Sequence, residues 1–448
     1  MEHIYVDRMN SLGQGIGVAS DGRTVFISGA LPGETVSIAV REQKKSYLIA
    51  RVDRVIERSE SRRSAPCRWY RSCGGCQLQH ADYKMQCRIK SMLLSDALRR
   101  IGRFDLGKEI PCIPSQSEWG YRNKASFPVR SFGQAGKTGF FKSGTHEIVP
   151  IDSCPVIGER ANALYAAIKK MVEEGQFCCY NERENEGWLR HVVIRSARDC
   201  KQLLLLLVVA AKPRGAALES LEGLYDYLKS PFPELCGLVL NINPDEGNVI
   251  LGSETIVVKG EDNLSEVLDE FTLEYDSTSF FQANPRQAER LFGYASGLVS
   301  GRNVVELYSG VGALTMYLAK RCASIKAVEQ WPSAARLAVV NGELNNVEGL
   351  EVTEGDAANI GEGILSEADC VAMDPPRTGC EREVLEAIIA ARTPEVLYIS
   401  CDPATFARDA KILREGGYEL NVESLRAFDM FPQTCHVESV ALLKRAEG

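Results

Sequence analysis

The sequence predicts a multidomain chain whose C-terminal part is an α/β domain with a doubly wound parallel sheet. From Asn284 onward, apolar strand-length segments alternate with helix-length segments, which is the pattern of parallel βα units. Residues 1–58 instead read as short strands and turns. At 448 residues the chain is long enough for about two to four domains. Its 45% hydrophobic and 25% charged residues exclude a disordered or fibrous protein.

Residues 1–58 are predicted to form a small N-terminal β-barrel. Gly13, Gly15 and Gly17 punctuate the first strand region, and TVFISGALPGETVSIAV reads as two strands joined by a Pro-Gly turn. A short module of strands and turns suits a five-stranded OB-like barrel, a fold that often holds oligonucleotides. We therefore expect this domain to bind nucleic acid.

The positive charge of the chain is concentrated in one segment. Between Arg41 and Arg103 there are 16 Lys and Arg against 6 Asp and Glu, whereas the rest of the chain holds 36 basic and 54 acidic residues. The formal net charge of −8 thus combines a segment of +10 with a remainder of −18. The acidic total argues against a nucleic-acid partner, but the asymmetry favours one end that faces a polyanion. A solvated basic face is the alternative.

Residues 59–276 are predicted to form a central α+β domain. A polar linker, SESRRSAPC, precedes an amphipathic helix over Asp82–Arg103 with a cationic outer face. Beyond Cys112, apolar strands alternate with short helices and Gly/Pro turns. The expected strands are Val192–Ile194, Leu203–Val209, Leu238–Ile242 and Val249–Leu251.

No targeting or membrane segment is expected. The N-terminus has no apolar stretch after its first charges, and the longest apolar run, Leu203–Ala211, is too short to span a bilayer. Fifteen cysteines in a long chain do not suggest a disulfide framework. We expect a reduced, cytoplasmic, monomeric protein whose cysteines are free to act as ligands, nucleophiles or core residues.

Residues 277–448 are predicted to form the doubly wound domain. A final hairpin that runs from Tyr418 through VESVALLKR adds antiparallel strands to the sheet. Because the carboxyl ends of parallel strands meet at one edge, the residues that directly follow the strands are candidates for a site. The expected parallel strands are NVVELY, SIKAVEQ, LEVTEGDA, DCVAMDPP and VLYISCD.

The first strand of this sheet leads into a glycine turn, ELYSGVGALTM. Gly310 and Gly312 allow close approach of the backbone to a ligand at the switch point of the sheet. Position 315 is Thr, so the GxGxxG dinucleotide pattern is absent. Glu329 ends the second strand, where a carboxylate can accept both ribose hydroxyls. The combination indicates an adenosine-containing ligand such as S-adenosylmethionine; a turn needed only for packing is the alternative.

Two further strand ends present reactive groups. Asp374 and Arg377 follow the fourth strand, and Cys401 follows the fifth. Asp402-Pro403 reads as a helix N-cap followed by Pro, so Cys401 would lie before a helix N-terminus whose partial positive charge lowers a thiol pKa. A small core cysteine is the alternative.

Glu438 interrupts an otherwise apolar final strand. Burial would raise its pKa towards that of a useful base, whereas the alternative is a surface residue at a strand end. A thiolate, a carboxylate and a methyl donor at one sheet edge suit methylation of carbon 5 of a pyrimidine. Thiolate addition at carbon 6 makes carbon 5 nucleophilic, and a base then removes the carbon-5 proton as the cysteine is expelled.

A separate group of cysteines has the spacing of a metal site. CRWYRSCGGC holds Cys67, Cys73 and Cys76, and Cys154 in DSCPV is the candidate fourth ligand. Iron–sulfur and a structural zinc site both fit four thiolates. Cys87 and Cys112 are nearby in sequence and stay open as ligands.

YISCDPATFARD, MDPPRTGC, DSTSFFQANP and FDMFPQTCHVESVALL together resemble the signatures of the RNA uracil-5-methyltransferase family. The chain is similar over essentially its whole length to the 23S rRNA branch, which has an N-terminal TRAM domain. The resemblance implies that Cys401 is the nucleophile and Glu438 the base. It further implies a 4Fe-4S cluster on the four cysteines above, S-adenosylmethionine contacts from Gln282, Tyr308, Glu329 and Asp374, and stacking of the flipped uracil on Phe280.

The departures from that family are modest. Asp402 stands where Asn is usual after the nucleophile, and Ser309 and Ala313 replace the Cys and Asn often seen in the glycine turn. The leading hypothesis is 5-methyluridine formation in 23S rRNA. Its alternatives are the same reaction in the T-loop of tRNA, a non-catalytic RNA-binding or ribosome assembly factor, and methylation of a base amino group.

Overall fold

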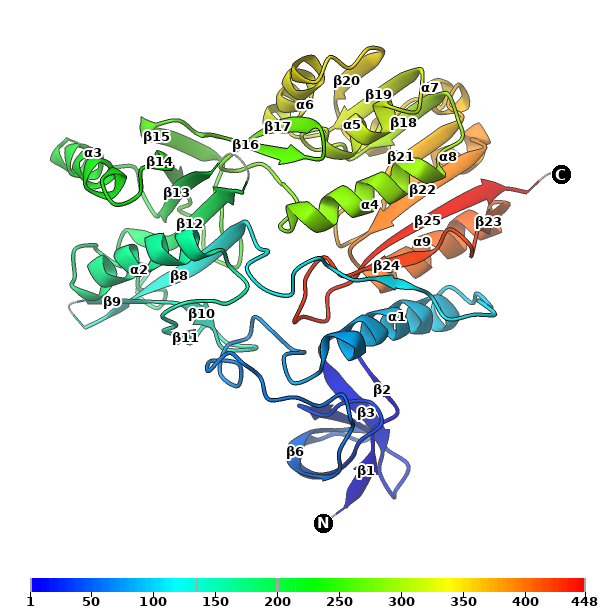
Figure 1. The fold of residues 1–448 in the computed structure, drawn as a ribbon, viewed down its shortest axis with the longest axis horizontal. Helices are drawn as coiled ribbons and strands as arrows, with labels where there is room; N and C mark the ends of the chain where they lie inside the picture. The colour runs from blue at the N-terminus through cyan, green and yellow to red at the C-terminus, as the bar shows by residue number, and fades with distance from the viewer. Residues whose placement is uncertain (1, 134, 199–200, 214, 447–448) are drawn as a thin grey trace.

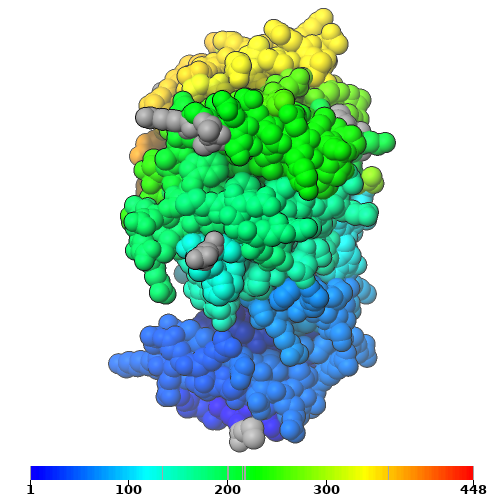
Figure 2. All heavy atoms as spheres, turned by 90° about the vertical axis from the view of Figure 1, so that its left-hand side faces the viewer, coloured from blue at the N-terminus to red at the C-terminus, as the bar shows by residue number. Residues whose placement is uncertain are grey.

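A computed structural model describes residues 2–133, 135–198, 201–213 and 215–446. The chain passes from an N-terminal β-sheet through helix α1 and a central domain to a C-terminal α/β domain (Figure 1). Figure 2 shows the central residues lying between the N-terminal residues and part of the C-terminal domain. Within the described ranges, none of the helices is both long and apolar enough to cross a bilayer.

The N-terminal sheet joins six described strands in the order β1-β5-β6-β4-β3-β2. The two strands expected within 24–40 are β4 and β5, but they do not pair with each other, because β6 lies between them. Alternate residues such as Val25 and Ile27 are buried in the core of this domain. The strands are β1 (His3–Tyr5), β2 (Arg8–Met9), β3 (Gln14–Val18), β4 (Thr24–Ser28), β5 (Thr35–Gln43) and β6 (Tyr47–Glu57).

The helix expected over 82–103 is α1 (Tyr83–Arg100). Asp82 is its N-cap and accepts from the backbone N–H of Met85 over 2.8 Å, as Asp does at this position. The sequence predicts a cationic outer face for this helix, but Lys90 does not lie on it. This side chain is fully buried and forms an ion pair with the buried carboxylate of Asp429.

The central domain is built on a sheet in the order β15-β14-β13-β12-β8-β9. Helices α2 (Glu159–Glu173) and α3 (Ala216–Lys229) cover one face and bury residues such as Leu164 and Leu228 against it. The strands are β8 (Lys124–Phe132), β9 (Ala135–Thr138), β12 (Leu189–Ala197), β13 (Gln202–Val209), β14 (Leu235–Ile242) and β15 (Glu254–Gly260). Two hairpins accompany it: β10 (Phe140–Phe141) with β11 (Ile148–Val149), and β16 (Asn263–Leu268) with β17 (Phe271–Asp276).

The prediction of a strand over Val249–Leu251 is wrong. The Asn243 side chain donates to the carbonyls of Val249 and Ile250 over 2.8 and 2.9 Å, and Val249 is 70% exposed. This asparagine satisfies the carbonyls that a strand would offer to a neighbour. The strand that pairs with β14 begins later, at Glu254.

The C-terminal sheet has the order β20-β19-β18-β21-β22-β25-β24-β7. Strands β18–β22 are the five predicted parallel strands, and the order reverses between β18 and β21. The C-terminal strands run antiparallel, as expected. The bounds are β18 (Asn303–Leu307), β19 (Ser324–Glu329), β20 (Leu350–Glu354), β21 (Cys370–Met373), β22 (Glu395–Ser400), β23 (Tyr418–Leu420, also on β25), β24 (Arg426–Phe428) and β25 (Glu438–Arg445).

One strand of this sheet comes from much earlier in the chain. β7 (Cys112–Ile113) pairs in parallel with β24, through Cys112 opposite Ala427. Helix α1 packs on the same sheet, burying Leu94 and Leu98 (Figure 1). Residues before 277 therefore contribute to the C-terminal sheet and to its core.

Helices cover both faces of the C-terminal sheet. α4 (Pro285–Leu298), α5 (Ala313–Ala319) and α6 (Pro332–Leu344) share one core, which also takes in Val193 and Leu204 of the central sheet. The opposite face packs against α1, α7 (Glu362–Ser366), α8 (Arg382–Ala391) and α9 (Pro403–Glu415), with a short 3-10 helix at Ala357–Asn359. The shared core joins the central and C-terminal domains.

Candidate active site

A cavity of about 500 Å³ lies at the carboxyl ends of the parallel strands, where the strand order reverses. We call it the switch-point cavity. The turns after β18, β19, β21 and β22, the start of β25 and the segment before α4 enclose it. All seven residues predicted for cofactor, catalysis and base binding line it: Phe280, Gln282, Tyr308, Glu329, Asp374, Cys401 and Glu438.

The glycine turn and Glu329 are joined by hydrogen bonds. Tyr308 and Gly310 both adopt positive φ, +60° and +56°, which turns the chain sharply between β18 and α5. The Glu329 carboxylate accepts from the backbone N–H of Gly310 over 2.8 Å and from that of Trp331 over 2.9 Å. These two bonds fix the carboxylate at the cavity wall, where it can accept the hydroxyls of a ribose.

The cavity also offers polar and aromatic groups for a nucleoside ligand. Ser309 Oγ is buried and has no hydrogen-bond partner among the described residues. Trp331 is 66% exposed beside Glu329. A donor or acceptor without a partner, a carboxylate and a flat apolar ring fit the adenosine part of S-adenosylmethionine.

Cys401 follows β22 directly, and Asp402 caps the next helix. The Asp402 carboxylate accepts from the backbone N–H groups of Ala404 and Thr405 over 2.8 and 3.1 Å, as predicted. The expected lowering of the thiol pKa is wrong. Burial, with the carboxyls of Glu438 and Asp374 nearby, raises the pKa of Cys401 to about 12. The charge of Arg377 acts in the opposite direction.

The carboxyl groups beside Cys401 hold their protons more tightly than usual. Burial and the charge of Asp374 raise the pKa of Glu438 to about 8, in the direction predicted for a base. Burial raises the pKa of Asp374 to about 7. The side-chain amide of Gln282 approaches the Asp374 carboxylate at 3.5 Å. Acidic groups that titrate near neutral pH can exchange protons with a substrate.

An aromatic side chain stands at the cavity mouth. Phe280 is 72% exposed, although it belongs to a segment whose neighbours Phe281 and Gln282 are buried. An exposed ring that lines a cavity can stack on a planar ligand without displacing core packing.

Sequence reasoning missed several residues of the switch-point cavity. Glu306 lies within β18, and burial raises its pKa to about 8. Arg377 was noted but given no role, and its guanidinium lies 3.3 Å from His436 Nδ1. In the sequence, Glu306 stands out as the charged residue inside the apolar strand NVVELY, and this pattern could have identified it as a site residue. Arg377 and His436 meet only through the fold.

The four cysteines predicted as metal ligands line a second cavity, of about 480 Å³, which we call the cysteine cavity. Burial and the neighbouring thiols raise the pKa of Cys76 to about 11 and that of Cys154 to about 12. The backbone N–H of Gly75 donates to Cys73 Sγ over 3.4 Å. Cys67 also lines this cavity.

The residues that the structure describes form no ready coordination sphere for a single metal ion. Among the residues that the structure describes, no group of three or more His, Cys, Asp or Glu lies close enough together to hold a metal ion. A tetrahedral zinc site needs sulfurs within roughly 3.8 Å of one another, since Zn–S bonds are about 2.3 Å. The four cysteines line one cavity, but the described residues do not show the metal site that the sequence predicts.

Residues 67–78, which we call the cysteine loop, form backbone hydrogen bonds with two domains. The backbone N–H of Gly74 donates to the Phe141 carbonyl of the central domain over 2.9 Å. The backbone N–H groups of Gln77 and Leu78 donate to the Gln433 carbonyl, just before β25. The loop thus connects the basic N-terminal part of the chain to both folded bodies.

Comparison with known proteins agrees with this geometry. Residues 251–446 match the family model described as tRNA (Uracil-5-)-methyltransferase, and residues 3–52 match the TRAM domain. The chain is 36% identical to an RNA methyltransferase of Clostridium acetobutylicum, over 99% of this chain and 97% of the relative. It is also 36% identical to one of Gloeobacter violaceus, over 97% and 94%.

A solved structure covers the whole architecture. The Pyrococcus abyssi tRNA (uracil-54, C5)-methyltransferase in complex with S-adenosyl-L-homocysteine has 27% identity and a TM-score of 0.77. The match covers 99% of this chain and 100% of that one. Fold, site and relatives define an S-adenosylmethionine-dependent RNA methyltransferase. More particularly, the chain belongs to the RNA uracil-5-methyltransferase family and has an N-terminal TRAM domain.

Proposed function

We propose that this protein methylates carbon 5 of a specific uridine in 23S rRNA through a covalent cysteine adduct. The observation that supports the chemistry is the convergence of Cys401, Glu438 and Asp374 in the switch-point cavity, next to the glycine turn and Glu329. Gln282, Tyr308, Glu329 and Asp374 are the proposed contacts to S-adenosylmethionine. When bound, this cofactor supplies an electrophilic methyl group.

In the proposed mechanism Cys401 Sγ adds to carbon 6 of the uracil and pushes the electron pair of the 5,6 double bond towards carbon 5. That pair makes carbon 5 nucleophilic. After methylation Glu438 takes the proton from carbon 5, the double bond forms again, and the thiolate leaves. The thiol has a pKa of about 12 in the absence of substrate, so Cys401 must lose its proton to water before it attacks, and the charge of Arg377 lowers this pKa and favours the thiolate.

The target base must leave its stack, because neighbouring bases cover carbons 5 and 6 of a stacked pyrimidine. Phe280 is proposed to hold the flipped uracil, since its ring is exposed at the cavity mouth. Base–aromatic stacking contributes about 1–3 kcal/mol per base.

We further propose that Cys67, Cys73, Cys76 and Cys154 hold a 4Fe-4S cluster. Four thiols around a cavity suit a polynuclear cluster better than a single zinc ion, because the cluster keeps its ligating sulfurs farther apart. Hydrogen bonds to sulfur such as Gly75 N–H to Cys73 are common around iron–sulfur groups. Methyl transfer needs no redox step, so the proposed role is to hold the cysteine loop between the domains.

The T-loop of tRNA is the second candidate substrate. The similar Pyrococcus abyssi enzyme acts on tRNA uracil-54 and matches essentially the whole chain. The 23S rRNA proposal instead depends on the sequence signatures. The two substrates require the same groups in the switch-point cavity, so the cavity itself favours neither.

Two experiments test the proposal. RNA with 5-fluorouridine at the target should trap a covalent adduct with the wild-type protein, because fluorine at carbon 5 cannot leave as a proton. The Cys401→Ala variant should form no adduct but should still bind S-adenosylmethionine; methyl transfer by this variant would refute the covalent mechanism. Mass spectrometric mapping of rRNA and tRNA from a deletion strain would then identify the uridine that loses its methyl group.

A further inference from the structure

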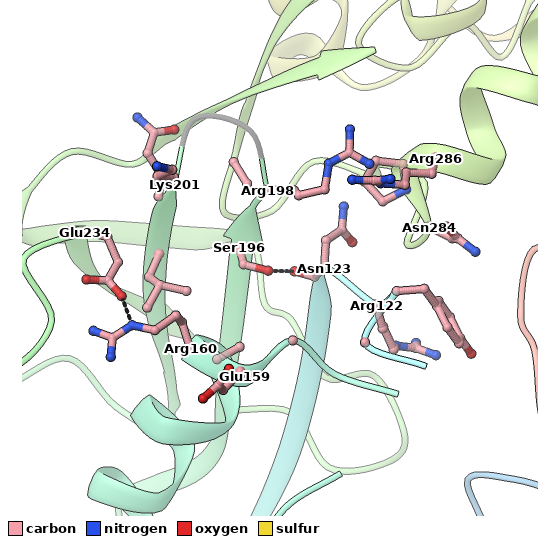
Figure 3. Close-up of a pocket in the computed structure, with 18 of the residues that line it drawn as sticks. Arg122, Asn123, Glu159, Arg160, Ser196, Arg198, Lys201, Glu234, Asn284 and Arg286 are labelled. Atoms are coloured by element: carbon pink, nitrogen blue, oxygen red, sulfur yellow. Dashed lines mark hydrogen bonds and ion pairs between the residues drawn. The ribbon is translucent and has the colours of Figure 1, made fainter. Parts of the chain in front are cut away.

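A third cavity, of about 680 Å³, lies between the central domain and the start of α4. Five cations from four separate places in the sequence line it, and we call it the arginine cavity. Figure 3 shows Arg198 and Arg286 at one end and Arg160 with Glu234 at another. The five cationic residues are Arg122, Arg160, Arg198, Lys201 and Arg286.

The charges of this cavity do not balance. Glu159 and Glu234 are the acidic residues of its lining. Arg160 is bound to Glu234, and Arg198 lies 3.4 Å from Glu289. Lys201 and Arg286 are exposed and make no ion pair with another described residue. In a chain of net charge −8, a hollow with surplus cations attracts an anion.

The backbone adds to this attraction. Helix α2 starts at the cavity with Gly158 as N-cap, so no side chain caps its first turn. Its first backbone N–H groups and the positive end of its dipole are therefore available to an anionic ligand. The surplus cations and the uncapped helix end are two independent features that favour the same charge.

One segment, residues 282–286, contributes to the lining of both the switch-point cavity and the arginine cavity. Gln282 lines the switch-point cavity, whereas Asn284 and Arg286, a few residues on, line the arginine cavity. Asn123 holds this segment: its side-chain amide donates to the Gln282 carbonyl over 3.1 Å, and its backbone N–H donates to the Ala283 carbonyl over 3.0 Å. Four residues span at most roughly 14 Å, the scale of a short stretch of RNA.

We propose that the arginine cavity binds the sugar–phosphate backbone of the nucleotides that flank the target uridine. The inference rests on the proposed function, because it takes the target base to lie in the switch-point cavity. In this proposal the phosphates next to the target nucleotide bind Arg286, four residues after Gln282, and Lys201, which lines the same cavity as Arg286. Phosphate contacts of this kind set the register of the strand without reading its sequence.

The test measures RNA affinity against salt concentration. The probe is fluorescein-labelled single-stranded RNA of about 12 nucleotides with one central uridine. Each single variant, Arg286→Gln or Lys201→Gln, should raise Kd about 3- to 10-fold at low salt, and the double variant should raise it roughly 10- to 100-fold. The slope of log K against log salt should fall by about 0.7 for each phosphate contact removed.

Two variants serve as controls. Arg302→Gln removes an exposed arginine just before β18, at the end of that strand away from the switch-point cavity, and should leave Kd and slope unchanged. Glu159→Gln removes a negative charge from the arginine cavity and should tighten RNA binding. Wild-type Kd and slope in the double variant would overturn the inference. Binding of inorganic phosphate that needs Arg286, together with unchanged RNA binding, would assign the cavity to a free anion and overturn it equally.

The outcome is separable from that of the proposed function. If wild-type protein binds RNA through Arg286 and Lys201 but transfers no methyl group to uridine, the proposed reaction fails and the RNA site stands. If the double variant methylates RNA with wild-type kcat/KM, the RNA site fails and the reaction stands. Thermal unfolding of each variant confirms that the fold is retained.

Discussion

The backbone N–H of Gln77 donates to the backbone carbonyl of Gln433 over 3.0 Å, which joins the cysteine loop to the chain that enters β25. Gln433 is fully buried with φ of +73°. Its amide oxygen accepts from Gln86 and Arg63, and its amide nitrogen donates to Glu118. Gln77 follows Cys76, and Glu438 lies shortly after Gln433, so this contact relates the proposed cluster to the proposed base.

Replacing Gln433 should slow the reaction more than it weakens RNA binding. Gln433→Ala removes the side-chain amide and leaves its buried partners unsatisfied, at a cost of about 1–3 kcal/mol for each unsatisfied group. We expect kcat to fall while KM for RNA stays near wild type. Gln433→Gly keeps the backbone conformation and should recover part of the stability. Gln176→Ala, at an exposed glutamine, is the control; an unchanged kcat in Gln433→Ala would refute the coupling.

The buried pair of Lys90 and Asp429 should show the asymmetry of buried charges. Lys90→Met leaves the Asp429 carboxylate in the core without its partner, which costs about 3–5 kcal/mol. Removal of both charges, in Lys90→Met with Asp429→Leu, should restore much of that loss. Urea unfolding of the two single variants and the double variant measures this. A double variant less stable than both singles would contradict the prediction.

Activity should increase with pH through neutrality. Glu438 has a pKa of about 8 and must be deprotonated to take the carbon-5 proton, and the Cys401 thiol has a pKa of about 12. Because both groups must lose a proton, kcat/KM should rise about a hundredfold per pH unit well below pH 8 and about tenfold per unit above it. Arg377 lowers both pKa values, so Arg377→Gln should move the profile to higher pH. A shift to lower pH in this variant would contradict the assignment.

The buried carboxyl groups of Glu306 and Glu438 should make the folded protein less stable as pH rises. Their pKa values in the folded state, about 8 for Glu306 and Glu438, lie above those of an unfolded chain. Their contribution to stability is thus fully present below the unfolded pKa and is lost as pH rises to about 8. Glu306→Gln should stabilise the protein at pH 8 by about 1 kcal/mol or more. Glu354→Gln, at an exposed position, should have no such effect in urea unfolding at pH 6 and pH 8.

The proposed iron–sulfur cluster can be tested by direct metal analysis. Protein purified without oxygen should be brown and contain iron and sulfide in near-equal amounts. Cys154→Ser should lose most of that iron, whereas Cys178→Ser, at an exposed cysteine, should keep it. Stoichiometric zinc in the wild-type protein would contradict the iron–sulfur proposal.

The repeating part of the fold could be read from the sequence because its signals are local. All five parallel strands of the C-terminal sheet are where alternation of apolar strands and helices placed them. The strand expected at Val249–Leu251 failed because Asn243, a side chain, takes up the carbonyls of that segment. β7 has two residues and pairs with a strand more than 300 positions later, so no local pattern could reveal it.

Part of the candidate site could likewise be predicted from the sequence, and part depends on the fold. Residues directly after parallel strands converge because strand ends share an edge, which places Asp374 and Cys401 together. The helix over 82–103 was predicted to have a cationic outer face, and helical spacing alone does not show that Lys90 pairs with Asp429 in the core. The thiol pKa of Cys401 was expected to follow the helix dipole alone, but the burial and two carboxyls supplied by the fold outweigh that dipole.

The pairing of Cys112 with Ala427 has a consequence for how the protein is made. During translation β7 leaves the ribosome early and has no hydrogen-bond partner until nearly the whole chain has followed. The outer edge of the sheet, on which α1 packs, therefore forms only when synthesis is almost finished. A nascent chain interrupted before β24 would expose an unpaired strand edge, which makes incomplete copies prone to aggregate rather than to act as partial enzymes.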